Sequence, residues 1–282
     1  MSEATWQCGD HVLPLDCPLV MGILNVTPDS FSDGGEYDNV TSAVMRAHAV
    51  VAEGADLIDV GGESTRPGSA SVSEPSELAR VLPVVERLAA ELTLPISIDT
   101  RHAPVARACV TAGASVINDV TGFRDPAMIE VAAECEAGLV VMHMLGDDPA
   151  TMQADPHYDD VVTEVAEFLA ERAAALESVG VDPKRIALDP GIGFGKTLEH
   201  NLALLRGVPT LAVLGYPVVI GASRKRFIGH ILGEEDPKRR VAGSVGAAAY
   251  AALHGADIFR VHDVAETVQA LRVIAAIGRG AL

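Results

Sequence analysis

The stretch LVMGILNVTPDSFSDGG, residues 19–35, begins as an apolar run and ends as a polar loop. Residues 19–24 carry no polar side chain, which is the pattern of a strand buried on both faces in a helix-covered parallel sheet. The chain then breaks at Asn25 into a loop that holds two acids, three hydroxyls and the aromatic Phe31. A polar loop has no structural need for a phenylalanine, so Phe31 predicts a loop that closes over a ligand.

The same unit of strand followed by loop recurs along the chain. Short β-rich runs are expected at 19–24, 56–60, 96–99, 115–118, 138–143, 185–189, 217–222 and 257–261. Ala-rich amphipathic segments lie between them, at about 40–53, 74–92, 102–112, 126–136, 159–179, 198–206, 238–254 and 263–277. Eight strand–helix pairs predict an α/β protein with the (β/α)8 TIM-barrel fold. A doubly wound open sheet is the alternative, but eight units without a change of rhythm favour closure.

Residues 4–18 precede the first of these strands. Two short polar-apolar pieces around Cys8-Gly9-Asp10 predict a short N-terminal hairpin that closes the bottom of the barrel. No linker, low-complexity segment or change of composition divides the chain, so residues 1–282 are expected to form a single domain.

The charge balance excludes some classes of partner. Lys and Arg number 21 against 39 Asp and Glu, a net charge of −18, which argues against binding nucleic acid or an anionic membrane. No apolar run approaches the ~20 residues of a membrane span, and no export signal is visible. The four cysteines have neither metal-binding nor redox spacing. A cytoplasmic protein with reduced thiols and small-molecule partners is therefore expected.

Polar side chains stand at the end of nearly every predicted strand, where a barrel carries its active site. They are Asn25, Asp59, Asp99, Asn118 with Asp119, His143, Asp189, Ser223 to Arg226, and Arg260, His262 and Asp263. A simpler role remains open for some of them. Asp119 and Asp263 can equally be caps of the following helices, and His143 can be a packed core histidine.

Two chemical interpretations of the later loops can be weighed from the residues. Residues 191–197 superficially suggest a phosphate loop, but the Walker spacing requires glycine at position 190, where Pro190 stands. A nucleoside-triphosphatase is therefore rejected. Lys225 suits a Schiff-base aldolase, yet its neighbours Arg224 and Arg226 fit the binding of an anion better than imine chemistry.

The motifs in combination are far more specific than each alone. NVTPDSFSDGG, GGESTRPG, SIDT, IND, DPGIGFGKT, SRKRFIG and RVHD, in this order, closely resemble the dihydropteroate synthase family over residues 19–277. The resemblance implies condensation of 6-hydroxymethyl-7,8-dihydropterin diphosphate with 4-aminobenzoate, giving 7,8-dihydropteroate and pyrophosphate in folate biosynthesis. It also implies assistance by Mg²⁺, inhibition by sulfonamides and a homodimer.

The resemblance carries roles onto particular residues. Asp99, Asn118, Asp189 and Lys225 are expected to bind the pterin. Asn25, Arg66, Arg260 and His262 are expected to bind the diphosphate, with Asn25 as a ligand of Mg²⁺. Thr65, Pro67, Phe194, Ser223, Arg226 and the Lys225 stem are expected to line the aminobenzoate pocket. Asp99, Lys225, Arg66 and Phe31 are the expected catalytic set.

One position departs from the pattern. Many members of the family have serine directly after the matching lysine, whereas Arg226 stands there in this chain. The contact to the aminobenzoate carboxylate is then expected from the Arg226 backbone N–H or guanidinium, at the start of the helix after Ser223.

The implied chemistry breaks the carbon–oxygen bond largely before the amine arrives. Negative Asp99 would stabilise the cationic pterin, and loops 27–36 and 64–70 would close and exclude water. Two rivals remain open. A methyltetrahydrofolate-dependent methyltransferase could share Asp99, Asn118 and Asp189, and a silent paralogue could bind pterin without turnover.

Overall fold

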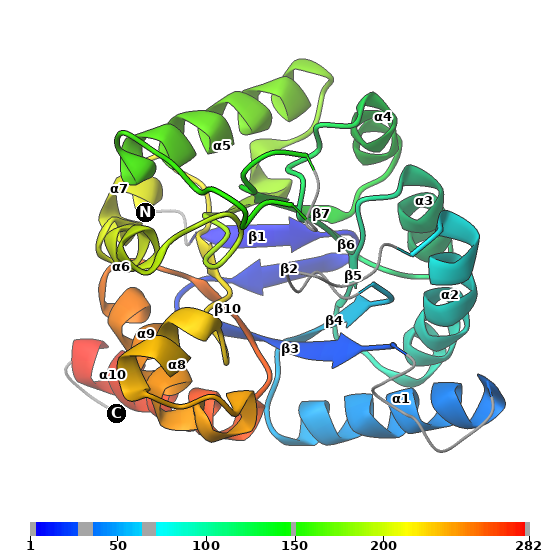
Figure 1. Ribbon diagram of the computed structural model, residues 1–282. Coiled ribbons are helices and arrows are strands. Elements are labelled where there is room, and N and C mark those ends of the chain that lie inside the picture. Colours follow the sequence, from blue (N-terminus) through cyan, green and yellow to red (C-terminus); the bar gives the residue numbers. More distant parts are fainter. Residues whose placement is uncertain (1–3, 28–35, 64–71, 148–150, 280–282) are drawn as a thin grey trace.

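Eight parallel strands form a nearly closed barrel in the computed structural model, and helices cover its outer face (Figure 1). The structure describes residues 4–27, 36–63, 72–147 and 151–279. The barrel strands are β3 (Leu19–Asn25), β4 (Leu57–Gly61), β5 (Ile96–Asp99), β6 (Val116–Asp119), β7 (Gly138–Met142), β8 (Ile186–Asp189), β9 (Val219–Ile220) and β10 (Ile258–Val261).

The helices follow the strands in alternation. They are α1 (Glu36–Ala52), α2 (Glu74–Glu91), α3 (Ala103–Thr111), α4 (Pro126–Glu134), α5 (Val161–Ser178), α6 (Leu198–Arg206), α7 (Val208–Ala212), α8 (Arg226–Leu232), α9 (Val241–Leu253) and α10 (Val264–Arg279). Two 3₁₀ turns, η2 (Pro183–Arg185) and η3 (Pro237–Arg239), precede β8 and α9. Within the described ranges, no helix is long and apolar enough to cross a membrane.

The strand order closes the sheet into a barrel. Hydrogen-bonded neighbours run β8-β7-β6-β5-β4-β3-β10-β9, and a parallel bridge between Leu188 and Val218 joins the two ends. The predicted (β/α)8 barrel is confirmed. The seventh strand is shorter than the predicted 217–222, because the ladder to β10 is limited to Val219 and Ile220.

The two-residue repeat of the strands decides which side chains enter the barrel. In β4, Leu57 packs inside the barrel, Ile58 packs outward against the helices, and Asp59 again points inward. The inward residues at the strand starts form an apolar lower layer that includes Leu57, Val116, Val140, Ala187, Val219 and Ile258. The next inward positions form the polar layer of the site.

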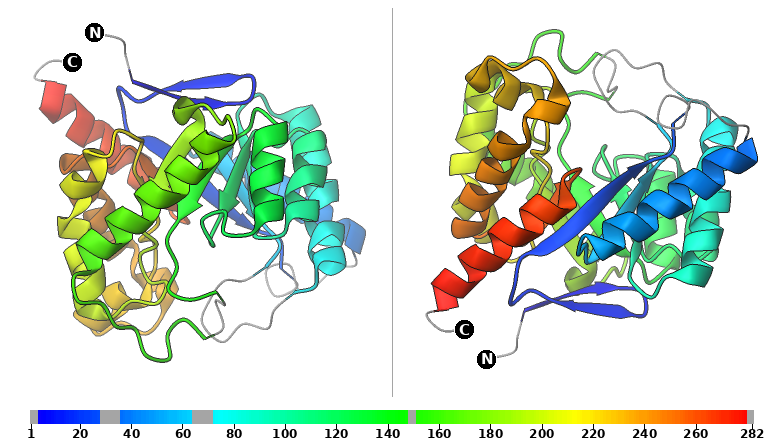
Figure 2. Two further views of the ribbon diagram at one scale, coloured as in Figure 1. Left: turned by 90° about the horizontal axis from the view of Figure 1, so that it is seen from above. Right: turned by 90° about the horizontal axis from the view of Figure 1, so that it is seen from below.

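An antiparallel hairpin covers the end of the barrel where the strands begin (Figure 2). It consists of β1 (Thr5–Cys8) and β2 (His11–Pro14), and the Trp6 side chain is fully buried in the lower layer. The Trp6 indole Nε1–H donates to the carbonyl of Arg185 at 2.9 Å, so its polar atom is satisfied. The predicted N-terminal hairpin is confirmed.

Candidate active site

A buried cluster of charged side chains lies at the carboxyl ends of the strands. Arg260 projects inward from β10, two residues after Ile258 of the lower layer. Its Nε donates to Asp59 Oδ2 at 2.6 Å and its Nη2 donates to Asp99 Oδ2 at 2.6 Å. One guanidinium thus joins carboxylates from two other strands.

Asp59, one of the polar residues expected at the strand ends, is the centre of this cluster, although the family resemblance gave it no role. It is fully buried and accepts a hydrogen bond from Ser97 Oγ at 2.6 Å. The amide of Asn118 lies 3.4 Å from both Asp59 oxygens. Asp59 therefore touches Asn118, expected to bind the pterin, and Arg260, expected to bind the diphosphate.

Burial controls the protonation of Asp99. Desolvation raises the pKa of its carboxyl to about 7; the Arg260 charge opposes this rise, and the Asp59 charge adds to it. Burial also acts against the charge of Arg260, but Asp59 and Asp99 outweigh it and raise the pKa of the guanidinium. The arginine therefore stays charged, while Asp99 changes charge near neutral pH.

Asp189 and Lys225 lie beside this cluster: a Cβ on Gly221 would lie 3.8 Å from Asp189 Oδ2 and 3.9 Å from both Arg260 Cβ and Lys225 Nζ. Asp189 Oδ1 accepts from the Gly191 N–H at 2.7 Å, and burial raises the pKa of its carboxyl against the nearby Lys225 charge. Lys225 is half-buried, and its Nζ donates to the carbonyl of Ile192 and lies 4.6 Å from the centre of the Phe194 ring. Desolvation lowers the pKa of Lys225 to about 8, against the charge of Asp189.

The glycines of the DPGIGFG motif make room for this arrangement. A Cβ on Gly191, whose φ is +66°, would lie 1.9 Å from the His143 carbonyl oxygen. A Cβ on Gly193, at φ +83°, would lie 3.1 Å from Lys225 Cδ. Glycine at these positions therefore lets the turn pack against the residue after β7 and against the Lys225 stem.

Ser223 and His262 bring the SRK and RVHD motifs together. Ser223 Oγ accepts from the His262 backbone N–H at 3.1 Å and lies 3.1 Å from its ring Nδ1. Arg226, by contrast, is exposed as the first residue of α8. The helix expected after Ser223 is present.

A second buried amine, Lys196, was also missed from the sequence. Its Nζ lies 2.9 Å from His143 Nδ1 and donates to the Phe194 carbonyl at 2.9 Å. Burial lowers the pKa of His143 to about 2, with the Lys196 charge acting in the same direction. His143 is therefore a neutral, packed histidine whose ring meets Phe168 edge-on at 4.9 Å.

The two acids that had a capping alternative have other partners. The Asp119 carboxylate accepts from the backbone N–H groups of Thr121 and Phe123, both at 2.8 Å, so it holds its own turn. Asp263 forms a bidentate ion pair with Arg224. Neither carboxylate belongs to the central cluster.

Asn25 ends β3 beside the cluster. A Cβ on Gly61 would lie 3.9 Å from Asn25 Oδ1 and 3.6 Å from Asp99 Oδ2, so both oxygens border the space above Gly61. Within residues 4–27, 36–63, 72–147 and 151–279, no three His, Cys, Asp or Glu side chains gather as a metal site. A few hard oxygens fit Mg²⁺ only if substrate phosphate and water complete the coordination shell.

Four expected site residues, Phe31, Thr65, Arg66 and Pro67, lie outside the described residues. The loops 27–36 and 64–70, expected to close, fall almost wholly in the same gaps. The roles expected of these residues stay predictions.

Comparison with known proteins places this site in a wider context. A family model described as pterin binding enzyme matches residues 21–262. A dihydropteroate synthase of Synechocystis sp. is 47% identical over 261 residues, 92% of this chain and 90% of that protein. Dihydropteroate synthase of Xanthomonas albilineans with 4-aminobenzoic acid has a TM-score of 0.93 at 50% identity, covering 98% and 99% of the two chains. The structure of that enzyme with 7,8-dihydropteroate has a TM-score of 0.89 at 48% identity, covering 97% and 98%.

Proposed function

The chain belongs to the dihydropteroate synthase family of pterin-binding enzymes, and on that basis we propose how its own residues divide the work of the reaction. It condenses 6-hydroxymethyl-7,8-dihydropterin diphosphate with 4-aminobenzoate and releases 7,8-dihydropteroate and pyrophosphate. The observation that supports this division best is the buried cluster of Asp59, Asp99, Asn118 and Arg260, with Asp189 and Lys225 beside it.

The pterin ring binds to Asp99, Asn118, Asp189 and Lys225. Its edge carries several amide-like donors and acceptors, and a buried pocket must match each of them or lose roughly 1–3 kcal/mol per unpaired group. The carboxylates and the Asn118 oxygen accept from the ring N–H groups, and Lys225 donates to the ring carbonyl. The burial of Asp99, Asn118 and Asp189 supports this assignment, because each needs a partner in the filled site.

The diphosphate binds to Arg260, His262, Asn25 and Arg66. Arg260 donates from its Nε to Asp59 and from its Nη2 to Asp99, so Nη1 is the nitrogen proposed to donate to a phosphate oxygen. Asn25 is proposed to supply a protein ligand of Mg²⁺, with phosphate oxygens as the others. Bound Mg²⁺ would neutralise charge on the departing pyrophosphate.

The aminobenzoate occupies the opening between Phe194 and the Lys225 stem, with Thr65, Pro67 and Phe31 from the loops. Its carboxylate lies at the start of α8, near Ser223 and the exposed Arg226. The chain is also a sulfonamide target. Sulfonamides present an aniline beside an acidic group, as 4-aminobenzoate does.

The reaction exchanges one bond at the pterin methylene. The carbon–oxygen bond to the diphosphate breaks and its electron pair leaves with pyrophosphate; the aniline nitrogen then forms the carbon–nitrogen bond and loses a proton. Asp99, when ionised, opposes the positive charge that develops on the ring before the amine attacks. The hydrogen-bond donors and cations around the diphosphate stabilise the leaving group.

A coupled assay tests the proposed residue roles. Titration calorimetry measures binding of the pterin diphosphate, and pyrophosphate release is then followed after 4-aminobenzoate is added, with and without Mg²⁺. Release that needs the amine, and that fails with Lys225→Ala, supports the assignment. Wild-type turnover by Lys225→Ala would contradict it, and binding without release would indicate a silent paralogue.

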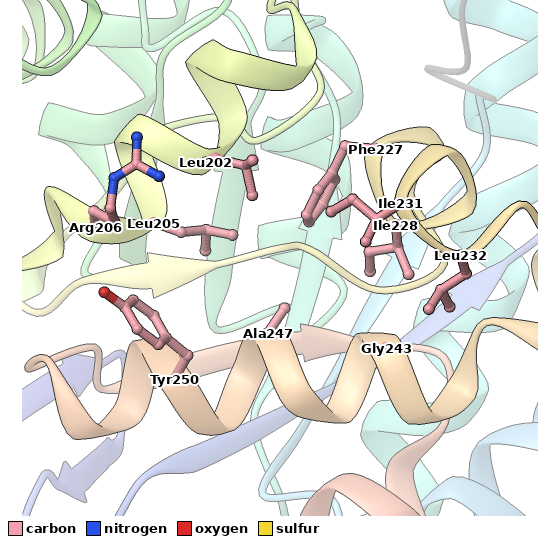
Figure 3. Close-up of a pocket in the computed structure, with 10 residues that line it drawn as sticks. All are labelled: Leu202, Leu205, Arg206, Phe227, Ile228, Ile231, Leu232, Gly243, Ala247 and Tyr250. Carbon is pink, nitrogen blue, oxygen red and sulfur yellow. The ribbon is translucent and has the colours of Figure 1, made fainter.

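We propose in addition that the chain forms a homodimer through the outer faces of α8 and α9. An apolar groove of about 390 Å³ runs between α6, α8 and α9 (Figure 3). Ile231 and Leu232, which line it, are 55% and 53% exposed, and Leu253 of α9 is 67% exposed. The sequence of α9, VAGSVGAAAYAAL, contains no charged residue. In a chain of net charge −18, such a face suits a second copy, because it avoids like-charge repulsion.

A further inference from the structure

Arg224, the residue directly before Lys225, has a left-handed backbone. Its φ is +58°, and Phe123 is the one other non-glycine residue within the described ranges that has a positive φ. A side chain at Cβ disfavours this conformation, so a residue adopts it only when its surroundings enforce it. Lys225 follows with extended backbone angles (φ −69°, ψ 157°) and leads into α8. The reversal at Arg224 therefore sets the direction in which Lys225 leaves the chain.

Both backbone polar groups of Arg224 are bound at the start of α9, by Ser244 in its first turn and by Arg240 directly before it. Its N–H donates to Ser244 Oγ at 2.9 Å, and its carbonyl accepts from Arg240 Nη1 at 3.0 Å. Ser244 Oγ in turn donates to the Arg240 carbonyl at 2.8 Å, so the two residues hold one another. Arg240 and Ser244 are both buried.

All three guanidinium nitrogens of Arg240 donate to backbone carbonyls. Its Nε donates to the Glu234 carbonyl at 3.0 Å and its Nη2 donates to the Glu235 carbonyl at 2.6 Å. A Cβ on Gly229 of α8 would lie 2.5 Å from Arg240 Cζ, so the guanidinium lies directly against that helix. A buried cation with all three nitrogens on carbonyls fixes α8, α9 and residue 224 relative to one another.

The side chain of Arg224 is fixed as well. Its Nε donates to Asp263 Oδ2 at 3.0 Å, and its Nη2 donates to Asp263 Oδ1. The Asp263 carbonyl accepts from Thr267 Oγ1 of α10 at 2.7 Å. The left-handed residue is therefore held from three sides.

We propose that Arg240, Ser244 and Asp263 are positioning residues that hold Arg224 in its left-handed conformation and thereby direct the Lys225 amine into the site. The inference deepens the proposed function and rests on the role given there to Lys225. None of the three touches the proposed substrates. Without their bonds, residue 224 relaxes toward negative φ and the amine leaves its place over Phe194.

The free enzyme supplies a readout that needs no substrate. The chain has four lysines, Lys184, Lys196, Lys225 and Lys238, so lysine labelled with ¹³C at Cε gives four NMR signals. The charged groups facing the Lys225 amine are Asp189, Asp99 and Arg260, and Lys196 lies near it. An amine that leaves this pocket regains water, so its titration midpoint rises.

The test compares Arg240→Ala, Ser244→Ala and Asp263→Asn with the control Arg239→Ala. Arg239 neighbours Arg240 but is exposed and paired with Glu234. In each test variant the Lys225 midpoint should rise by about one pH unit or more. The kcat/KM for the pterin diphosphate should fall about ten- to a hundredfold, as a misplaced catalytic group predicts. The control should change neither quantity.

A double-mutant cycle separates positioning from general stability. Glycine adopts a positive φ without penalty, so in Arg224→Gly residue 224 should keep its left-handed conformation with less help from the Ser244 hydrogen bond. Ser244→Ala is expected to lower kcat/KM about tenfold in the Arg224 chain but less than about twofold in the Arg224→Gly chain.

The outcomes distinguish this inference from the proposed function. If the Lys225 signal titrates as in the unaltered chain while the melting temperature falls, the three residues are merely structural and the inference is wrong. An equal effect of Ser244→Ala in both backgrounds also overturns it. If the Lys225 midpoint rises but turnover holds, the positioning is correct and the role of Lys225 in the reaction is wrong. Asp263→Asn, which keeps the side-chain shape, decides the question if Arg240→Ala does not fold.

Discussion

Single residues in the mouth of the barrel act through their neighbours. Arg260 donates to Asp59 and Asp99 at once, and Asp59 also accepts from Ser97. Such a shared network would couple the subsites proposed for the pterin and the diphosphate. Removing one member therefore changes the charge and direction of the others as well as its own contact.

The change Asp99→Asn tests the cationic route. It keeps the size of the side chain but removes the charge that opposes the developing positive charge on the ring. We expect kcat to fall by more than about a hundredfold, while the Kd of the pterin diphosphate changes less than about tenfold. Single-turnover pyrophosphate release and titration calorimetry measure the two quantities separately. A strongly weakened Kd with an unchanged single-turnover rate would make Asp99 a binding residue instead.

The pH profile follows from the same carboxyl and from Lys225. Asp99, with a pKa raised to about 7, is protonated below that pH, and Lys225, with a pKa lowered to about 8, loses its charge above that pH. The kcat/KM should therefore be bell-shaped, falling on the acid side near 7 and on the alkaline side near 8. Lys225→Arg should remove the alkaline fall and keep the acid one. An activity that stays level from pH 6 to 9 would contradict both assignments.

Asp59→Asn tests the support of Arg260. In Asp59→Asn, an NH2 donor replaces one carboxylate oxygen. That oxygen now accepts from either Ser97 or Arg260, so one of these hydrogen bonds is lost, and we expect Arg260 to turn further toward Asp99. We expect the pterin diphosphate to bind about ten- to a hundredfold more weakly, the cost of one charge-assisted hydrogen bond. Ser97→Ala is the matched control, because it removes one bond to Asp59 and keeps the charge. Calorimetry should show a smaller loss there, and equal losses would remove the special role of the Arg260 contact.

The sequence predicts part of this residue network and leaves the rest open. Because side chains alternate along a strand, Asp59 points inward like Leu57 two residues before it. The sequence therefore indicates an inward position for Asp59. The partnership of Asp59 with Arg260 spans 201 residues and depends on how the barrel closes. Neither alternation nor composition reports which carboxylate a distant guanidinium reaches. Arg260, expected on the diphosphate, therefore has two carboxylate partners that no local pattern indicates.

At the scale of elements, strands and helices of two turns or more are predicted well, whereas the shortest helices are not. The strand expected at 96–99 and the helix expected at 198–206 match β5 and α6 residue for residue. Helices α7 and α8, with five and seven residues, are too short to show a helical period. The expected helix at 238–254 starts later, at Val241, because Pro237–Arg239 form a 3₁₀ turn.

Trp6→Ala tests the hairpin as the base of the barrel. The indole is fully buried in the lower layer and its N–H reaches the Arg185 carbonyl. Its loss should reduce the free energy of unfolding by about 3–5 kcal/mol and lower the Tm by roughly 10 °C. The KM values should stay near those of the unaltered chain below the new Tm, since the site lies at the other end. Val12→Ala, at an exposed hairpin position, serves as the control in the same thermal scans.

At the scale of the whole molecule, the charge is unevenly distributed. The chain carries a net −18, yet α9 has no charged residue along its length. Composition alone argues against nucleic acid and anionic surfaces as partners but does not locate the uncharged face, which depends on the packing of α6, α8 and α9. The cytoplasmic location expected from the sequence stays a prediction.

The double variant Ile231→Glu/Leu253→Glu tests the homodimer. Both side chains are exposed in the single chain, so the substitutions should leave its folding nearly unchanged. Two glutamates on each copy of the face should convert the dimer to a monomer in sedimentation experiments. Met45→Glu, at an exposed position on α1, should leave the mass unchanged. A monomeric unaltered chain, or a dimeric double variant, would contradict this interface.

The stacking of an apolar layer beneath a polar one bears on how such an enzyme changes over generations. The inward residues that include Leu57 and Ile258 form the apolar base of the barrel, whereas the next inward positions carry the polar side chains proposed to meet the substrates. A lineage exposed to an antifolate can therefore alter residues around the mouth while the base keeps the chain folded. Such escape is limited by Arg260 and its two carboxylates: replacing Arg260 leaves Asp59 and Asp99 without their shared cation, and replacing either carboxylate leaves Arg260 with one counterion instead of two.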